Sequence, residues 1–320
     1  MTNPIKILVF CAGKSALPSC QLLHLDGYLA GIVLDGKQPE VQSLFNESFG
    51  NQFPRFLIQH KRDYDQLALW LTEIGPTALF SIAFPYLIPD HLLEQYPRRW
   101  INFHMGKLPD YRGPMPIFEA LKAGEEEAVL TVHLMDRQYD TGEIIWEEEI
   151  GIDGQETFGS LAIKFTEQIS LAAQNTAQML QFGGELPVRA QPNSSAYCPF
   201  PTVKDTSINW AYMNADEIVS LCQACNPWNG GADTSIGNLV FKVLKAEKLV
   251  GEEHYEIPGK ILSGIEPLAI GCVDGEVVRI QLVSSDYGIE LAKDFSIRLN
   301  QSQLLLGKQG EEKVAGSVKI

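Results

Sequence analysis

Three side chains of different chemistry, an amide, an imidazole and a carboxylate, occur within one stretch of the sequence, residues 101–142. Asn102 and His104 end a short apolar segment, and in an extended strand their alternate spacing places both side chains on the same face. Asp140 comes 36 positions after His104, in an Asp-Thr-Gly sequence typical of a tight turn. An amide can stabilise an oxyanion, an imidazole can carry a proton near neutral pH, and a carboxylate can orient that imidazole. The set is therefore suited to acyl transfer.

The same stretch contains no nucleophile for a covalent route. No Ser or Cys in it lies in the strained strand-to-helix turn that exposes a catalytic nucleophile, so we expect direct transfer without an acyl-enzyme. A purely structural interpretation is also open at this point. In that interpretation Asn102 and His104 cap the end of a strand, and Asp140 is an ordinary turn residue.

The residues around these three resemble the active-site signature of the folate-dependent formyltransferase family. This family includes methionyl-tRNA formyltransferase, glycinamide ribonucleotide formyltransferase and the nucleotide-sugar N-formyltransferases. The signature consists of Asn-x-His, Leu-Pro-x-x-x-Gly and Asp-x-x-x-Asp-Thr-Gly, in that order. In this chain it is formed by Asn102 and His104, by Leu108, Pro109 and Gly113, and by Asp136, Asp140, Thr141 and Gly142. One position departs from the pattern, because Gly106 occurs where members commonly have Ser, and this leaves the acceptor side of the site open.

The resemblance implies an enzyme that moves a formyl group from 10-formyltetrahydrofolate to a primary amine, without a metal. Asn102 and His104 would stabilise the oxyanion, and Asp140 would assist proton removal from the amine through water. The folate would lie between the loop at residues 84–89 and the segment 136–140. Its expected contacts are Tyr86, Leu87, Ile88, Asp136, Arg137, Gln138, Tyr139 and Asp140.

The first 100 residues alternate between strand and helix patterns, which predicts an α/β domain with an open, mostly parallel, Rossmann-like sheet. The expected strands lie at residues 5–10, 29–34 and 77–83. A polar stretch at 35–51 is expected to be a linker. The turn after the first strand contains one glycine, Gly13, and no G-x-G-x-x-G, so a nicotinamide cofactor is not expected. The loop at 84–89 follows a strand whose apolar run indicates burial on both faces, and open α/β sheets bind ligands at such a strand end.

A segment rich in Gly, Pro, Asn and Ser divides the chain into two predicted domains. We expect a catalytic domain at residues 1–183, a linker at 184–204 and a smaller, open β-barrel-like (OB-like) domain at 205–320. The segment around Trp210 and Trp228 resembles the C-terminal domain shared by methionyl-tRNA formyltransferases and aminoarabinose-modifying enzymes. Both tryptophans are expected to anchor packing, because no basic residues alternate with them as in a base-stacking surface.

The charge distribution bears on the identity of the acceptor. The chain carries a net charge of −15, and residues 201–320 hold 11 Lys or Arg against 16 Asp or Glu. Binding of nucleic acid depends on cations placed at phosphates, and the basic insertion typical of methionyl-tRNA formyltransferases is missing from 35–51, where Lys37 is the one cation. We therefore favour a small amine, on a nucleotide-linked sugar or a carrier-bound amino acid. Methionyl-tRNA formyltransferase is the alternative, and a formyltetrahydrofolate hydrolase or a non-catalytic folate-binding protein is a further one.

The remaining titratable residues have mainly structural interpretations. His133 alternates with apolar residues and is expected to be a core histidine. Arg112 is expected near an anionic acceptor, on the Asp140 side of the cleft, or in a surface ion pair. The six cysteines, including Cys222 and Cys225, are expected to be free thiols rather than a metal or redox site. The sequence has no apolar run of about 18 residues and no signal-peptide pattern, so we expect a cytoplasmic protein without membrane contact. The oligomeric state is left open.

Overall fold

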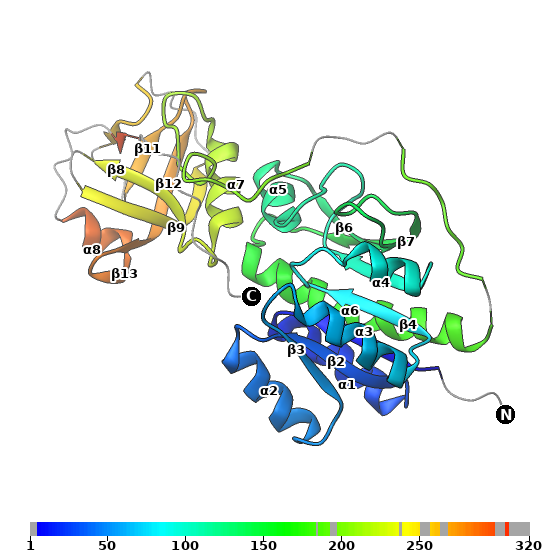
Figure 1. The fold of residues 1–320 in the computed structure, drawn as a ribbon. Helices are drawn as coiled ribbons and strands as arrows, with labels where there is room; N and C mark the ends of the chain where they lie inside the picture. The colour runs from blue at the N-terminus through cyan, green and yellow to red at the C-terminus, as the bar shows by residue number, and fades with distance from the viewer. Residues whose placement is uncertain are drawn as a thin grey trace.

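Two β-sheets organise the protein (Figure 1). The computed structural model describes residues 5–183, 185–192, 197–236, 239–249, 257–262, 268–297 and 305–306. The first sheet has the strand order β3-β2-β1-β4-β5-β6-β7, and the second has the order β10-β11-β12-β9-β8-β14, with β13 paired to β12. The predicted combination of a Rossmann-like domain and a smaller β domain is confirmed.

The first sheet is parallel from β3 to β5 and antiparallel at β6 and β7. Its strands are β1 (Ile7–Cys11), β2 (Leu29–Asp35), β3 (Arg55–Ile58), β4 (Ala78–Ile82), β5 (Trp100–His104), β6 (Glu127–Leu134) and β7 (Ile144–Gly151). The helices of this domain are η1 (Lys14–Ala16), α1 (Leu17–Leu25), α2 (Pro39–Phe49), α3 (Asp63–Ile74), α4 (Asp90–Gln95), α5 (Pro116–Lys122) and α6 (Phe158–Gln181).

Strand β1 shows why helices cover both faces of this sheet. Ile7, Val9 and Cys11 belong to one buried cluster, which also contains residues of α1, α2, α5 and α6. Leu8 and Phe10 belong to a second cluster, with residues of α3 and α4. Because successive side chains of a strand point to opposite faces, a strand without polar residues needs an apolar layer on each side.

The prediction of a linker at residues 35–51 was wrong, since α2 occupies most of that stretch. Pro39 begins the helix, a position where its fixed φ is favourable and its missing N–H costs nothing. Val41 and Phe45 lie four residues apart on the same helix face and are buried in the first cluster. The polar composition thus belongs to the exposed face of an amphipathic helix.

The second domain is an antiparallel sheet with one helix at its start. Its elements are α7 (Ala215–Cys225), β8 (Ala232–Ile236), β9 (Leu239–Leu249), β10 (Ile261–Leu262), β11 (Ala269–Gly271), β12 (Val277–Ser285), β13 (Gly288–Leu291), α8 (Ala292–Ser296) and β14 (Leu305–Leu306). Helix α7 begins with a capping box between Asn214 and Glu217, which satisfies backbone N–H groups at its first turn. The boundaries at residues 183 and 205 stay a prediction.

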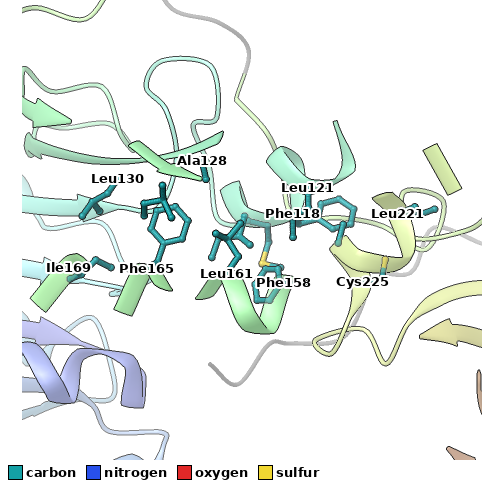
Figure 2. Close-up of a cluster of buried hydrophobic side chains, with 14 of the residues drawn as sticks. Phe118, Leu121, Ala128, Leu130, Phe158, Leu161, Phe165, Ile169, Leu221 and Cys225 are labelled. Atoms are coloured by element: carbon teal, nitrogen blue, oxygen red, sulfur yellow. The ribbon is translucent and has the colours of Figure 1, made fainter. Parts of the chain in front are cut away.

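A continuous apolar core joins α7 to the catalytic domain (Figure 2). Phe118 of α5 and Phe158 of α6 are buried together with Leu221 and Cys225 of α7. Trp228 packs edge-on against Phe118, with 5.5 Å between ring centroids. Each fully buried Phe contributes about 1.5–3 kcal/mol, so α7 is firmly attached to the catalytic domain.

The two tryptophans of the second domain are packing residues, as predicted. Trp210 is 2% exposed, and its indole Nε1 donates a hydrogen bond to Thr234 Oγ1 at 3.0 Å. Trp228 Nε1 donates to the carbonyl of Ala224 at 2.6 Å. Cys222 and Cys225 are buried free thiols, and burial raises the pKa of both. Among the helices that the structure describes, none is long and apolar enough to cross a membrane.

Candidate active site

A cavity lies at the point where the strand order of the first sheet reverses. Strand β1 lies between β2 and β4, so the connections after β1 and β4 leave in opposite directions and open a crevice at the carboxyl ends of these strands. The cavity has a volume of about 390 Å³, which suits part of a small molecule. Its lining comes from residues 12–13 after β1, Gln38, 83–85 after β4, 102–105 of β5 and its loop, 113–116, 139–140, Tyr197 and Phe200.

Asn102, His104 and Asp140 lie together in this cavity, and Asp140 is the centre of the group. Asn102 Nδ2 donates a hydrogen bond to Asp140 Oδ1 at 3.3 Å. His104 Nδ1 lies 3.6 Å from the same oxygen. The side chains of His104 and Asp140 are only 6% and 11% exposed, so their charges are weakly screened by water.

His133 is a member of this group that the sequence interpretation missed. It is 1% exposed, as expected for a core histidine, but it lies directly opposite Asn102 in the β5–β6 register. Its Nδ1 donates to the carbonyl of Leu134 at 2.8 Å, which leaves Nε2 as an acceptor for Asn102 Nδ2 at 3.1 Å. His133 therefore fixes the orientation of the Asn102 amide. Its position seven residues before Asp140 was a possible signal, but only the strand register shows the contact.

Asp140 is held in an unusual backbone conformation. Its φ is +56°, a left-handed value that Asp tolerates better than most residues because its short side chain can bond locally. The second carboxylate oxygen, Oδ2, accepts a hydrogen bond from the backbone N–H of Gly113 at 3.2 Å. Gln191 Nε2 donates to the carbonyls of Asp140 and Gly142, at 3.0 and 2.8 Å. The linker between the domains thus helps to fix the turn that carries Asp140.

Two glycines of the signature have no space for a side chain. A Cβ on Gly113 would lie 2.0 Å from the carbonyl oxygen of Cys198, and its φ is +130°. A Cβ on Gly142 would lie 1.8 Å from the carbonyl oxygen of Leu134. Both obstacles are backbone atoms that cannot rotate away. Glycine at these positions therefore lets the loop that contains Gly113 and the turn that contains Gly142 come together around Asp140.

Gly106, where the family signature commonly has Ser, has a similar steric reason. A Cβ there would lie 2.5 Å from Pro116 Cβ and 3.0 Å from His104 Nε2. A serine at this position would require α5 and the His104 ring to shift. The site therefore has no side chain at 106, and His104 Nε2 instead donates to the carbonyl of Tyr111 at 2.8 Å.

This hydrogen bond defines the tautomer of the neutral His104 ring. Because a carbonyl only accepts, Nε2 carries the hydrogen, and in the neutral ring Nδ1 is an unprotonated nitrogen facing Asp140. Burial lowers the pKa of His104, although the Asp140 charge opposes this. Burial also disfavours the Asp140 carboxylate, but the charge that His104 carries in the acidic range where Asp140 titrates, together with the Gly113 N–H, outweighs it and lowers the pKa of Asp140 to about 2. Near neutral pH the pair is therefore a neutral imidazole beside an ionised carboxylate.

Arg112 is not in a surface ion pair. Its side chain is buried, with 9% exposed, and Nη2 donates to the carbonyl of Tyr139 at 3.2 Å. Its Nε is buried without a hydrogen-bond partner among the described residues. The carbonyl of Arg112 accepts a hydrogen bond from the backbone N–H of Cys198 at 2.8 Å. Arg112 thus connects the segment around Tyr139 with the linker at Cys198.

The residues predicted to contact folate divide into two groups. Tyr86, Leu87 and Tyr139 line a second cavity of about 500 Å³, and Tyr139 also lines the first. Three of the other side chains have partners within the protein: Ile88 is buried in the core, Asp136 accepts hydrogen bonds from Gln138 N and Thr141 Oγ1, and Arg137 pairs with Asp90 and Glu94. Contact by Ile88, Asp136, Arg137 or Gln138 stays a prediction and would come from their backbone groups.

No group of three or more His, Cys, Asp or Glu side chains able to hold a metal occurs among the residues that the structure describes.

Comparison of the sequence with known proteins identifies the family of this chain. Residues 50–173 match the formyl transferase family model, and residues 202–295 match the model of the formyl transferase C-terminal domain. A methionyl-tRNA formyltransferase of Pelotomaculum thermopropionicum is 30% identical over 224 residues, which cover 69% of this chain and 70% of that protein. This chain belongs to the formyl transferase family.

A further relative and a solved structure are also similar to this chain. The methionyl-tRNA formyltransferase of Heliobacterium modesticaldum is 27% identical, and the match covers 66% of this chain but only 65% of that relative, just under two thirds of its length. The crystal structure of WlaRD, a sugar 3-N-formyl transferase obtained in the presence of dTDP and 5-N-formyl-THF, has a TM-score of 0.63 at 20% identity. That likeness covers 87% of this chain and 97% of WlaRD, and at this identity it supports the fold.

Proposed function

We propose that this formyl transferase moves the formyl group of 10-formyltetrahydrofolate to the primary amine of a small acceptor, by direct attack. The observation that carries the proposal is the convergence of Asn102, His104 and Asp140 in one cavity at the switch point of the sheet. Direct acyl transfer needs a hydrogen-bond donor for the oxygen that gains charge and a base for the proton of the amine. Asn102 provides the first, and the pair of His104 and Asp140 provides the second.

The two adjoining cavities suit a long donor. The first contains the polar group around Asp140, and the second has an apolar floor formed by Ile58, Leu87 and Pro89. Tyr139 lines both, so the two cavities adjoin at this residue. A tetrahydrofolate combines a polar fused ring, a benzoyl group and an acidic tail, and it would supply the formyl group already bound to a nitrogen. Side-chain contacts from Tyr86, Leu87 and Tyr139 would hold it.

His104 is the proton acceptor in this proposal. Its unprotonated Nδ1 faces the cavity beside Asp140, while Nε2 is occupied by the Tyr111 carbonyl. When the amine attacks the formyl carbon and Nδ1 takes its proton, the imidazolium that forms lies next to an ionised carboxylate. Asp140 therefore stabilises the charged form of His104 and keeps Nδ1 as the reactive nitrogen. The bond between the formyl carbon and N10 of the donor then breaks, and His104 returns the proton to N10, so that tetrahydrofolate leaves and the base is regenerated. In this proposal His104 is the base, whereas the family resemblance implied that Asp140 assists proton removal through water.

Asn102 is the hydrogen-bond donor to the formyl oxygen. In the structure its two N–H groups face His133 Nε2 at 3.1 Å and Asp140 Oδ1 at 3.3 Å. The contact with His133 is the shorter one and holds the amide in place. The longer contact with Asp140 is the one that a substrate oxygen would replace. His133 acts as a positioning residue, because its effect on the reaction would pass through Asn102.

A small amine on a nucleotide-linked sugar or a carrier-bound amino acid is the favoured acceptor. Tyr197 and Phe200 of the linker form one wall of the first cavity, which limits what can approach His104 from that side. In the second domain Lys242, Lys248 and Arg279 are already paired with carboxylates. Residues 201–320 are net acidic as well, with 11 cations against 16 anions. These features offer little to tRNA phosphates.

Methionyl-tRNA remains the second candidate acceptor, since the relatives found by sequence carry that name. The experiment that separates the candidates supplies purified protein and 10-formyltetrahydrofolate with nucleotide-linked amino sugars, carrier-bound amino acids or methionyl-tRNA in parallel. Formation of an N-formyl product with a small amine at a rate well above that with methionyl-tRNA supports the proposal. Efficient formylation of methionyl-tRNA alone would replace it with the alternative. Hydrolysis of the donor without any acceptor would indicate a hydrolase.

A further inference from the structure

Tyr197 of the linker brings to the catalytic cavity a hydroxyl that the proposed reaction leaves unused. Its ring lines the cavity beside Tyr139, with 6.4 Å between the two ring centroids. Tyr197 is 45% exposed, and its Oη has no hydrogen-bond partner among the residues that the structure describes. A phenol in such a place can pack its ring against a ligand and donate a hydrogen bond to it.

The backbone that carries Tyr197 is held against the catalytic domain. The next residue, Cys198, donates its N–H to the carbonyl of Arg112 at 2.8 Å. The Cys198 carbonyl oxygen lies 2.0 Å from the position that a Cβ on Gly113 would take, so the two segments are in close contact. Tyr197 is therefore part of a preformed wall, and a ligand that uses it does not have to order the chain first.

The surroundings of the phenol keep it protonated. Burial raises the pKa of Tyr197, the Asp140 carboxylate raises it further, and the Arg112 guanidinium acts in the opposite direction. Near neutral pH the hydroxyl is therefore an uncharged hydrogen-bond donor. Such a donor suits an uncharged oxygen of a ligand, in a hydroxyl or a carbonyl group.

The neighbouring parts of the wall cannot make this hydrogen bond. Residues 113–116, which contact the linker at Cys198, contribute Gly, Pro, Met and Pro to the cavity, and the linker itself adds Phe200. Among these described lining residues, Tyr197 is the one with a side-chain hydrogen-bond donor. The polar group around Asp140 acts on the reacting atoms. Recognition of a further oxygen from the linker side therefore depends on Tyr197.

We infer that Tyr197 is a specificity-determining residue of the acceptor site, and that its hydroxyl donates a hydrogen bond to an oxygen on the carbon next to the one that bears the amine. The inference rests on the proposed function, because it takes the acceptor to be a primary amine that attacks beside His104. The cavity holds only about 390 Å³, so the atoms next to the amine lie close to its wall. A site that donates to such an oxygen disfavours amines that lack it.

Both classes of small acceptor have an oxygen in this position. An amino sugar presents it as the hydroxyl beside the amine, and a carrier-bound amino acid presents it as the carbonyl. The two sources share one chemistry, an uncharged oxygen acceptor at a fixed separation from the nucleophilic nitrogen. Acceptor pairs that differ only in this oxygen distinguish the sources.

The test compares each acceptor with an analogue that lacks the oxygen. The full chain is supplied with 10-formyltetrahydrofolate and either a dTDP-linked 3-amino sugar or the same compound with the hydroxyls beside its amine replaced by hydrogen. Alanine methylamide, and the amine in which CH₂ replaces its carbonyl, represent the amino acid class. Mass spectrometry of the N-formyl products gives kcat/KM for each amine. Wild type and variant are compared on the same amine, so differences in intrinsic reactivity cancel.

Tyr197→Phe keeps the ring and removes only the hydroxyl. It should lower kcat/KM about threefold to tenfold for the amines that carry the oxygen, the usual effect of one neutral hydrogen bond, and by less than about twofold for their analogues. KM for 10-formyltetrahydrofolate should stay unchanged. The matched control is Tyr212→Phe, which removes the hydroxyl of a tyrosine that is 81% exposed in the second domain. It should leave kcat/KM unchanged for all four amines.

The outcomes separate this inference from the proposed function. An effect of Tyr197→Phe that is confined to one acceptor class supports the inference and identifies the oxygen as a hydroxyl or a carbonyl. An equal loss for amines with and without the oxygen gives Tyr197 a structural role and overturns the inference. An unchanged kcat/KM for both oxygen-bearing amines, or a raised KM for the formyl donor alone, also overturns it and leaves a formyl transferase. Failure of the wild-type protein to formylate any amine would contradict the proposed function itself, and this inference with it.

Discussion

Gln191 donates a hydrogen bond from Nε2 to the carbonyl of Asp140, 51 positions earlier in the chain, at 3.0 Å. The same nitrogen donates to the carbonyl of Gly142 at 2.8 Å. Asp140 has a φ of +56°, a conformation that persists where surrounding contacts hold it. The linker that leads to the second domain thus supports the backbone on which the carboxylate depends. Gln191 is a positioning residue in this account.

Replacement of Gln191 by Ala should lower kcat about tenfold with little change in KM, since it removes two hydrogen bonds that fix Asp140 and leaves the cavity walls in place. Gln191→Glu should behave similarly, because a carboxylate cannot donate to the two carbonyls. Steady-state kinetics with the preferred acceptor provide the measurement.

The control for this prediction is Gln223→Ala. Gln223 Nε2 also donates to a backbone carbonyl, that of Gly154 at 2.7 Å, but far from Asp140 in the sequence and outside the cavity lining. A purely structural role predicts a similar small fall in Tm for both variants and an unchanged kcat. If Gln191 positions Asp140, kcat falls only for Gln191→Ala.

Removal of the reacting groups should have much larger effects. His104→Ala and Asp140→Asn should each reduce kcat by about 10²–10⁴-fold, the usual loss when a proton acceptor or its charged partner is removed. Circular dichroism and Tm verify that the variants are folded. Wild-type turnover in a folded His104→Ala protein would remove His104 from the mechanism.

His133→Phe should lower kcat about tenfold to 100-fold and reduce stability by about 1–3 kcal/mol. It leaves the Asn102 amide and the Leu134 carbonyl without their partners in a buried place. His133→Gln retains an acceptor for Asn102, so it should recover part of kcat. If both variants lose stability but turn over at the wild-type rate, His133 has only the structural role that its sequence pattern suggested.

The pH dependence of kcat/KM follows from the shifts of the two groups. His104 must be unprotonated to act, and its pKa is lowered from the usual 6.5, so activity should persist below pH 6.5 and fall only as the pH passes through the lowered pKa. The pKa of Asp140 is about 2, so protonation of Asp140 does not cause the loss of activity on the acidic side of the pH profile. Asp140→Asn removes the charge that raises the pKa of His104, and NMR titration of the His104 ring should show a still lower value. An upward shift in that variant would contradict the assignment.

The charge of the second domain gives a prediction for tRNA. Each phosphate contact on duplex nucleic acid adds roughly 0.9 to the slope of log affinity against log salt, so a tRNA-binding enzyme should show steeply salt-dependent association. We expect weak binding of initiator tRNA with a shallow slope. Filter binding at low and moderate salt measures it, and tight, salt-sensitive association would favour the methionyl-tRNA alternative.

The parallel sheet and the group formed by Asn102, His104 and Asp140 could be predicted from the sequence. The residues that hold this group in place could not. Strands that are wholly or almost wholly apolar, such as β1 and β4, identify a sheet covered on both faces, and the spacing of Asn102 and His104 places both on one side of β5. His133 was missed because its contact with Asn102 depends on the register of β6 against β5, which no local pattern contains. Gln191 was missed because it acts across 51 positions from a segment without regular structure. Helix α2 was missed because its two buried residues are outnumbered by polar ones.

Direct formyl transfer at the group formed by Asn102, His104 and Asp140 can be followed in a single-turnover experiment. Purified protein is mixed with 10-formyltetrahydrofolate labelled in the formyl group, first without and then with a nucleotide-linked amino sugar, and intact-protein and product masses are followed over time. We expect the label to pass to the amine of the acceptor without ever being carried by the protein, and His104→Ala to slow the transfer by about 10²–10⁴-fold. A labelled protein intermediate, or transfer at the wild-type rate by folded His104→Ala, would contradict it.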